Sequence, residues 1–140
     1  MILFLDIDGV LHEISRSRGV LVFLPDFERI MRDFPDVDIV ISSAWRQVHS
    51  LPELRTFFNQ DIAARIIDFT PIIGGPIDYD YSRETEILTW IRENGREYER
   101  WVALDDCAEY FSYRCPNLIV VDGDRGLNPA VEAELRKRLS

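Results

Sequence analysis

Short apolar runs alternate with amphipathic stretches along the whole chain. The apolar runs have the length of single strands and cover residues 2–5, 37–41, 66–69, 101–104 and 118–121. Between them, apolar residues recur at spacings of three and four, which predicts helices over 25–34, 52–59, 83–94 and 129–139. Strands that alternate with helices form parallel sheets with helices packed on both faces. The pattern therefore predicts an α/β fold of three layers, Rossmann-like, around a parallel five-stranded sheet.

Capping residues sharpen two of these helix boundaries. Ser82 is expected to cap the helix over 83–94, and Gly95 stands where a helix-ending glycine belongs. Asn128 is expected to cap the last helix, with Pro129 as its first residue. The residues expected to face inward are Leu54, Phe57 and Phe58 in the second helix and Ile87, Leu88 and Ile91 in the third. The glycines, proline and aspartates of residues 74–82 predict a loop.

The length and composition of the chain fit one globular domain spanning residues 1–140. Hydrophobic residues make up 46% of the 140 residues, which is enough to build a core. No internal repeat, low-complexity tract or linker interrupts the sequence.

The net charge limits the kinds of binding partner that the protein can have, and the cysteines bear on its cellular compartment. A net charge of −9 argues against non-specific binding to nucleic acid or to an anionic membrane, although it leaves room for a local basic pocket. Cys107 and Cys115 are too few for a disulfide framework and lack the spacing of a zinc site. No basic region precedes the first apolar run, which is too short for a signal peptide or a membrane span. We therefore expect a cytoplasmic protein with free thiols and no membrane association.

Polar side chains follow three of the predicted strands directly. They are Asp6 and Asp8 after the first, Ser42 and Ser43 after the second, and Asp105 and Asp106 after the fourth. Parallel strands end at one edge of a sheet, so we expect these residues to converge there. Several carboxylates in one crevice need a compensating positive charge. Oxygen ligands without histidine or cysteine favour Mg²⁺, which readily takes a phosphate oxygen as a further ligand.

These residue types also suit phosphoryl transfer. The Asp6 carboxylate can attack phosphorus and form an aspartyl-phosphate. Asp8, two residues on, is placed to protonate the leaving oxygen and later to deprotonate the attacking water. Gly9 lets the backbone turn tightly beside the phosphate.

Three motifs in order, "DIDGVL", "IVISSAWR" and "VALDD", resemble those of the haloacid dehalogenase (HAD) superfamily of phosphohydrolases. The stretches "SSAWR", "RETEILTWI" and "VVDGDRGL" are similar to small capless members found as phosphatase domains in nucleic-acid repair proteins. The resemblance runs from Ile2 to about Leu135 and implies a HAD-like fold without a cap domain.

The resemblance implies a role for each matching residue. Asp6 matches the nucleophile, Asp8 the acid/base and Ser42 the residue that binds phosphate. Asp105 and Asp106 match the acidic metal motif, in which the second acid is often the direct ligand and the first holds a water or a basic partner. The Asp8 position usually gives its backbone carbonyl to the metal. The implied metal set is therefore Asp6, Asp8, Asp105 and Asp106 around Mg²⁺.

The chain departs from the family pattern in one feature. Relatives commonly carry a lysine or arginine before the fourth strand that contacts the nucleophile and the phosphate. The only lysine here, Lys137, lies in the last helix and is a poor candidate for this role. Arg83 stands at about the right place, and Arg46 is its rival because it follows the Ser42 loop. A surface salt bridge is the plain alternative for either arginine. The expected phosphate-binding residues are Gly9, Ser42, Ser43, Arg46 and Arg83.

The function implied by the resemblance is a Mg²⁺-dependent phosphomonoester hydrolase that works through an aspartyl-phosphate. A non-catalytic phosphate- or metal-binding module of the same fold is the alternative. The stretches between Asp8 and Ser42 and over 70–82 are too short to hold a cap domain. An open crevice admits a nucleic-acid end, a nucleotide, another small phosphomonoester or, less in keeping with the resemblance, a phosphoprotein. The sequence does not indicate an oligomeric state.

Several other residues have two readings. Ser42 could cap a helix as well as bind phosphate, and Trp45 could pack in the protein or stack on a base. A single histidine such as His12 is usually a surface or turn residue, although it follows the catalytic loop closely. Tyr79 and Tyr81 could line the substrate or pack. Asp122 and Asp124 favour a turn over a contact with the site.

Overall fold

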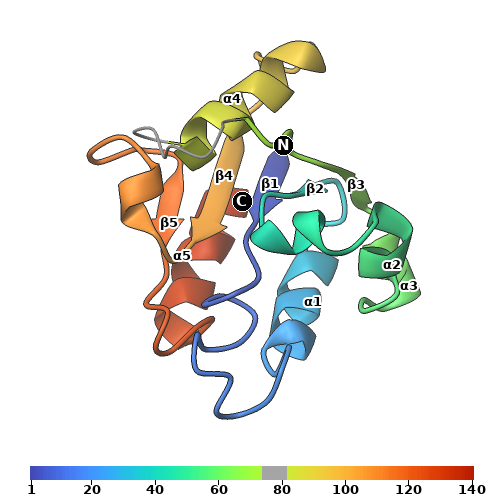
Figure 1. Ribbon diagram of the computed structural model, residues 1–140, viewed down its shortest axis with the longest axis vertical. Helices are drawn as coiled ribbons and strands as arrows, with labels where there is room; N and C mark the ends of the chain where they lie inside the picture. The colour runs from blue at the N-terminus through green and yellow to red at the C-terminus, as the bar shows by residue number, and fades with distance from the viewer. Residues whose placement is uncertain (74–81) are drawn as a thin grey trace.

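Five parallel strands form the sheet of this computed structural model, which describes residues 1–73 and 82–140. The strands are β1 (Ile2–Leu5), β2 (Asp38–Ile41), β3 (Ile66–Phe69), β4 (Trp101–Asp105) and β5 (Leu118–Val120). They lie in the order β3-β2-β1-β4-β5, so that β1 is central (Figure 1). In register, Leu3 of β1 pairs with Ile39 of β2 and Val102 of β4. The predicted α/β fold with a parallel five-stranded sheet is confirmed.

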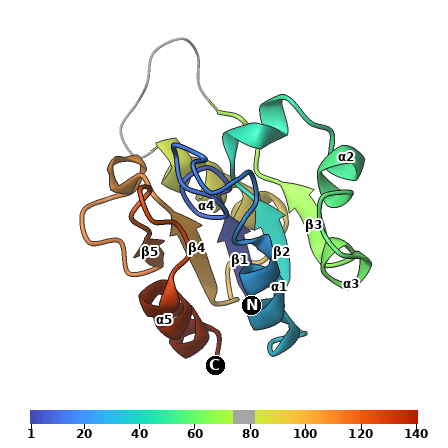
Figure 2. The ribbon, with the colours of Figure 1, turned by 90° about the horizontal axis from the view of Figure 1, so that it is seen from below.

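Helices cover both faces of the sheet. Helices α1 (Leu24–Arg32) and α5 (Pro129–Leu139) lie on one face, and α4 (Ser82–Glu93) lies on the other (Figure 2). The short helices α2 (Leu51–Arg55) and α3 (Gln60–Ala63) flank the β3 edge. Two 3₁₀ turns, η1 (Ala44–Gln47) and η2 (Ala108–Tyr110), follow β2 and β4. Within the described residues no inserted domain interrupts this order, so the expected absence of a cap is confirmed. None of the helices described is long and apolar enough to span a bilayer.

The strands are apolar throughout because both of their faces are buried. Leu3 and Leu5 of β1 point toward the core shared with α1 and α5. Ile2 and Phe4 point toward α4, where the Phe4 ring meets the Trp90 ring edge-to-face at 5.7 Å. The two cores hold the central strand rigidly, and its carboxyl end presents the first acidic motif.

Two details of the helices differ from the predictions. The helix predicted over 52–59 ends early, since α2 stops at Arg55 and a separate helix, α3, begins at Gln60. Between them the Asn59 backbone N–H and side-chain amide both donate to the Glu28 carboxylate of α1, which holds the chain in this break. Phe57, just beyond α2, is 40% exposed and does not face the core as predicted.

The buried face of α4 was also predicted incorrectly in part. Leu88 is 46% exposed, and Trp90 is buried together with Ile87 and Ile91, a spacing of three and four residues that matches one helical face. Ser82, predicted as the cap of this helix, is its first residue. The rest of the predicted loop over 74–82 lies outside the described residues, as do Tyr79 and Tyr81.

Candidate active site

Three carboxylates meet at the carboxyl edge of the sheet. Asp6 follows β1, Asp105 is the last residue of the neighbouring β4, and Asp106 comes next. One carboxylate oxygen from each lies within 4.8 Å of the others. The structure therefore brings together three of the four acidic residues predicted as a metal site. The Asp8 side chain is outside this group.

Burial makes it energetically unfavourable for these carboxyl groups to be ionised. Asp6 is 7% exposed and Asp105 is 1% exposed. Burial, followed by the negative charge of Asp105, raises the pKa of Asp6 well above its ordinary value. Burial also raises the pKa of Asp105 to about 6. Both carboxyl groups therefore ionise less readily than a solvent-exposed aspartate, and a further positive charge would favour their ionised forms.

The ligand chemistry of the group fits a hard cation. Asp105 Oδ1 accepts a hydrogen bond from the Cys107 N–H at 2.9 Å, whereas the buried Asp105 Oδ2 has no hydrogen-bond partner. Buried polar atoms normally have a partner, and the nearest cation, Arg83 Nε at 3.7 Å, is too far for a hydrogen bond, so this oxygen is free to bind a cation. All three side chains offer oxygen only, which suits Mg²⁺ better than zinc.

Two glycines make room for the Asp106 side chain. A Cβ atom at Gly9 would lie 2.3 Å from Asp106 Oδ2, and a Cβ atom at Gly123 would lie 2.8 Å from the same oxygen. Gly9 also has a φ of +78°, which side-chain-bearing residues rarely adopt. The sequence singled out Gly9 for its approach to phosphate, but nothing in the local pattern indicated that Gly123 contacts the site.

Asp8 is held by a separate set of donors. Its Oδ1 accepts from His12 Nε2 at 2.7 Å and from Arg16 Nη2 at 3.1 Å. Partial burial acts to raise the pKa of Asp8, but hydrogen bonds from His12, Trp45 and Arg16 outweigh it, so that the pKa lies below its ordinary value. His12 is fully buried, which is not the surface position usual for a single histidine.

Ser42 and Ser43 are both buried where β2 ends. The Ser42 N–H donates to the Leu5 carbonyl at 3.0 Å, which ties the loop to β1. Ser43, rather than Ser42, caps the following turn, since its hydroxyl accepts from the Trp45 N–H at 3.2 Å. The capping role considered for Ser42 therefore belongs to its neighbour.

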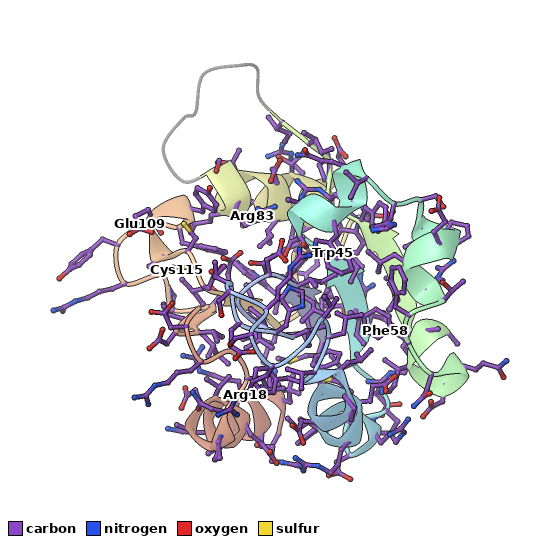
Figure 3. All side chains as sticks on the ribbon, turned by 60° about the horizontal axis from the view of Figure 1, so that its bottom comes forward. Arg18, Trp45, Phe58, Arg83, Glu109 and Cys115 are labelled. Carbon is purple, nitrogen blue, oxygen red and sulfur yellow. The ribbon has the colours of Figure 1, made fainter. Side chains whose placement is uncertain are left out.

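Arg83 lies where the sequence predicts a basic residue beside the nucleophile and the phosphate. It belongs to the first turn of α4 (Figure 3). It donates to the Ser42 carbonyl, and its Nε lies 3.7 Å from Asp105 Oδ2. Its positive charge acts to lower the pKa of both Asp6 and Asp105, against the effect of burial. The guanidinium also lies over the Tyr110 ring, 5.6 Å from its centroid.

Arg46 has a different environment. Its guanidinium donates to three carbonyls, those of Ser42, Ser43 and Thr70, and pairs with Glu86 at 2.9 Å. The Arg46 side chain is 2% exposed. These partners occupy the guanidinium without a substrate, which favours Arg83 over Arg46 as the phosphate ligand.

A family model described as the HAD domain in Swiss Army Knife RNA repair proteins matches residues 2–131. The chain belongs to this HAD domain family. Neither a curated protein nor a solved structure matches the chain. The family and the HAD-like fold predicted from the three motifs are confirmed.

In this HAD domain Trp45 is a packing residue. Its half-buried ring lies against the rings of His12, His49 and Phe57 at centroid distances of 5.8, 5.4 and 5.9 Å. Asp122 forms the predicted turn, since its Oδ1 accepts from the Asp124 N–H at 3.0 Å. Cys107 and Cys115 are free thiols.

Proposed function

We propose that this HAD domain is a Mg²⁺-dependent phosphomonoester hydrolase. The observation that carries the proposal is the buried, oxygen-only group of Asp6, Asp105 and Asp106 with Arg83 beside it. A Mg²⁺ ion held by Asp6, Asp106 and the Asp8 carbonyl, with Asp105 on a bound water or on Arg83, would neutralise charge on the phosphoryl oxygens. Gly9, Ser42, Ser43 and Arg83 would surround the phosphate.

The chain's own residues carry the reaction in two steps. An Asp6 carboxylate oxygen attacks phosphorus, the bond from phosphorus to the ester oxygen breaks, and Asp8 gives that oxygen its proton. Water then attacks the aspartyl-phosphate, Asp8 takes a proton from the water, and the bond from phosphorus to Asp6 breaks to release phosphate. Asp8 is therefore protonated again once the product phosphate has formed.

The pKa of Asp8 is consistent with both of its roles. With no phosphate nearby it is lowered, so Asp8 is ionised near neutral pH. A doubly charged phosphoryl group that enters beside Asp8 opposes this ionisation and raises its pKa. Asp8 can therefore hold a proton when substrate is bound and act as a base after the ester oxygen has left.

The substrate we propose is a phosphorylated RNA end or nucleotide, in keeping with the RNA repair proteins named for the family. The site lies at a sheet edge that no inserted domain covers within the described residues, so a long chain can approach it. The net charge of −9 makes general affinity for RNA weak, and the site must recognise the phosphate end itself. Other small phosphomonoesters are the alternative substrates. Free thiols at Cys107 and Cys115 fit the cytoplasm as the compartment.

A non-catalytic phosphate-binding module is the second candidate. The observation in its favour is that Arg83, rather than a lysine, lies beside Asp105. Arginine stays charged and binds phosphate well, but it does not replace lysine atom for atom.

The test compares hydrolysis of 3′- and 5′-phosphorylated oligoribonucleotides, free nucleotides and p-nitrophenyl phosphate, each with Mg²⁺ and with EDTA. We expect turnover only with Mg²⁺ and an acyl phosphate on Asp6 after acid quench. Asp6→Asn should abolish both, and the exposed Asp124→Asn should leave them unchanged. Phosphate binding without turnover by the wild type would favour the non-catalytic module. Near wild-type turnover by Asp6→Asn would refute the nucleophile assignment.

A further inference from the structure

We propose that His12 is a positioning residue for Asp8, whose carboxylate it holds in the orientation needed for proton transfer. This inference rests on the proposed phosphatase function. It concerns a residue that neither binds phosphate nor belongs to the carboxylate group at the sheet edge.

The hydrogen bonds of His12 fix its tautomer. The Leu21 backbone N–H donates to His12 Nδ1 at 3.1 Å, so Nδ1 must carry a lone pair. In the neutral imidazole the proton then lies on Nε2, which donates to Asp8 Oδ1 at 2.7 Å. The His12 side chain has no exposed surface, so water cannot substitute for either partner. The imidazole therefore connects a backbone amide rigidly to the carboxylate.

The loop that carries these contacts has an unusual backbone. Leu21 has a φ of 59° and Arg16 a φ of 56°, although residues with side chains seldom occupy the left-handed region. Leu21 presents its N–H to His12, and Arg16 places its guanidinium 3.1 Å from Asp8 Oδ1. Two of the three non-glycine residues with a positive φ in the described chain thus lie in the segment that supports Asp8, the third being Arg114, and strain of this kind clusters at functional sites.

Positioning has a specific kinetic consequence. Asp8 transfers protons, and without His12 its carboxylate keeps Arg16 and Trp45 as donors. A less well oriented carboxylate slows the steps that need a proton and leaves phosphate binding unchanged. Loss of the His12 contact should therefore lower kcat more than it changes KM. The effect should be large for an alkoxide leaving group, which needs protonation, and smaller for the activated p-nitrophenolate in the first step.

The experiment uses His12→Leu, which removes the donor, and His12→Gln, which can place an amide N–H near the position of Nε2. The matched control is His49→Leu, because His49 also packs on Trp45 but makes no contact with Asp8. Single-turnover rates are measured with a 5′-phosphorylated oligoribonucleotide and with p-nitrophenyl phosphate. We expect His12→Leu to lose about 10²-fold on the oligoribonucleotide, at the low end of general acid catalysis, and clearly less on the aryl ester. His12→Gln should recover most of the loss, and His49→Leu should behave like the wild type.

A second readout does not depend on activity. The ¹⁵N chemical shifts of His12 in the metal-free protein should report the tautomer protonated at Nε2. A tautomer protonated at Nδ1, a wild-type rate for His12→Leu, or an equal loss on both substrates would each overturn the inference. If His12→Leu does not fold, the single-turnover rate of His12→Gln on the oligoribonucleotide must still exceed that of His12→Asn, because only the longer amide reaches Asp8. A wild type inactive on every phosphomonoester would overturn the phosphatase proposal itself, and with it this role.

Discussion

At the scale of single residues, the Asp106 side chain fits into its site only because two neighbouring residues are glycines. Gly9 and Gly123 both approach Asp106 Oδ2 closely enough to exclude any side chain. The two glycines come from loops after β1 and β5, so the carboxylate is held between segments far apart in sequence. We infer that this confinement, together with the hydrogen bond between the Asp106 and Asp6 side chains, selects the orientation of the proposed metal ligand.

Gly123→Ala tests this confinement. The new Cβ would lie 2.8 Å from Asp106 Oδ2 and 3.0 Å from Ile14 Cγ1, so the Asp106 carboxylate must shift. The φ of Gly123 lies outside the left-handed region, so the fold should survive. Mg²⁺ affinity, measured by calorimetry, should fall ~10–100-fold, as it does when groups around a metal ligand are disturbed.

Asp124→Ala is the matched control for this variant. It removes an exposed carboxylate from the same loop without adding an atom next to Asp106, and it should bind Mg²⁺ like the wild type. Unchanged affinity in a folded Gly123→Ala protein would show that Asp106 does not hold the ion.

At the scale of elements, Arg46 joins three segments behind the site. Its guanidinium binds carbonyls at the ends of β2 and β3 and the Glu86 carboxylate of α4. Burial acts to lower the pKa of Arg46, and the Glu86 charge opposes this effect. Because the loop with Ser42 is fixed by these bonds, Arg46 acts on the proposed phosphate site through the backbone.

Arg46→Met should therefore destabilise the protein strongly. It removes the nearest cation from Glu86, whose side chain is 8% exposed and which, among the described residues, keeps only the Ile73 N–H at 3.0 Å and Arg83 at 3.6 Å. Breaking one side of a buried pair costs about 3–5 kcal/mol. Urea denaturation should show this loss, and Arg46→Met/Glu86→Gln should lose less than the sum of the two single changes.

The exposed pair Arg32–Asp61, at 2.7 Å, provides the comparison. Arg32→Met should cost under about 1 kcal/mol, because solvent screens such pairs. A similarly small loss for Arg46→Met would mean that Arg46 is free to contact substrate.

The elements that the sequence predicted correctly depend on local pattern. β1, β3 and α5 follow from apolar runs and from Asn128-Pro129, and the meeting of Asp6 with Asp105 follows from the common edge of parallel strands. What could not be predicted depends on contacts between distant segments. The break between α2 and α3 needs Glu28 of α1.

The same limit applies to the candidate site. The motif order predicts which residues carry the chemistry and favours Arg83 for the family role, but it leaves Arg46 as a rival near the phosphate. The structure separates them, because Arg46 pairs with Glu86 at 2.9 Å and also binds the Ser43 and Thr70 carbonyls, whereas Arg83 lies 3.6 Å from Glu86 and 3.7 Å from Asp105. The supporting contact of His12 likewise depends on the loop bringing Leu21 back to it.

At the scale of the whole molecule, the fold buries the carboxyl groups of Asp6 and Asp105 in a chain whose net charge is −9. The excess negative charge attracts cations to the molecule, and the raised pKa values of Asp6 and Asp105 show where a cation relieves most repulsion. Proton and metal therefore compete for the same carboxylates.

This competition predicts that Mg²⁺ stabilises the protein more as the pH rises. The pKa of Asp105 is about 6 in the folded state, against an ordinary value of 3.8, so the folded state binds more protons than the unfolded state between these values. Stability of the metal-free protein should therefore fall as the pH rises through this window. Mg²⁺ binds the ionised form, so the gain in Tm from excess Mg²⁺ over EDTA should be small at about pH 5 and larger at about pH 7.5. Asp105→Asn should make the gain in Tm depend less on pH, whereas the exposed Asp122→Asn should keep the wild-type dependence. A gain in Tm of equal size at both pH values in the wild type would contradict the assignment of Asp105 to the metal group.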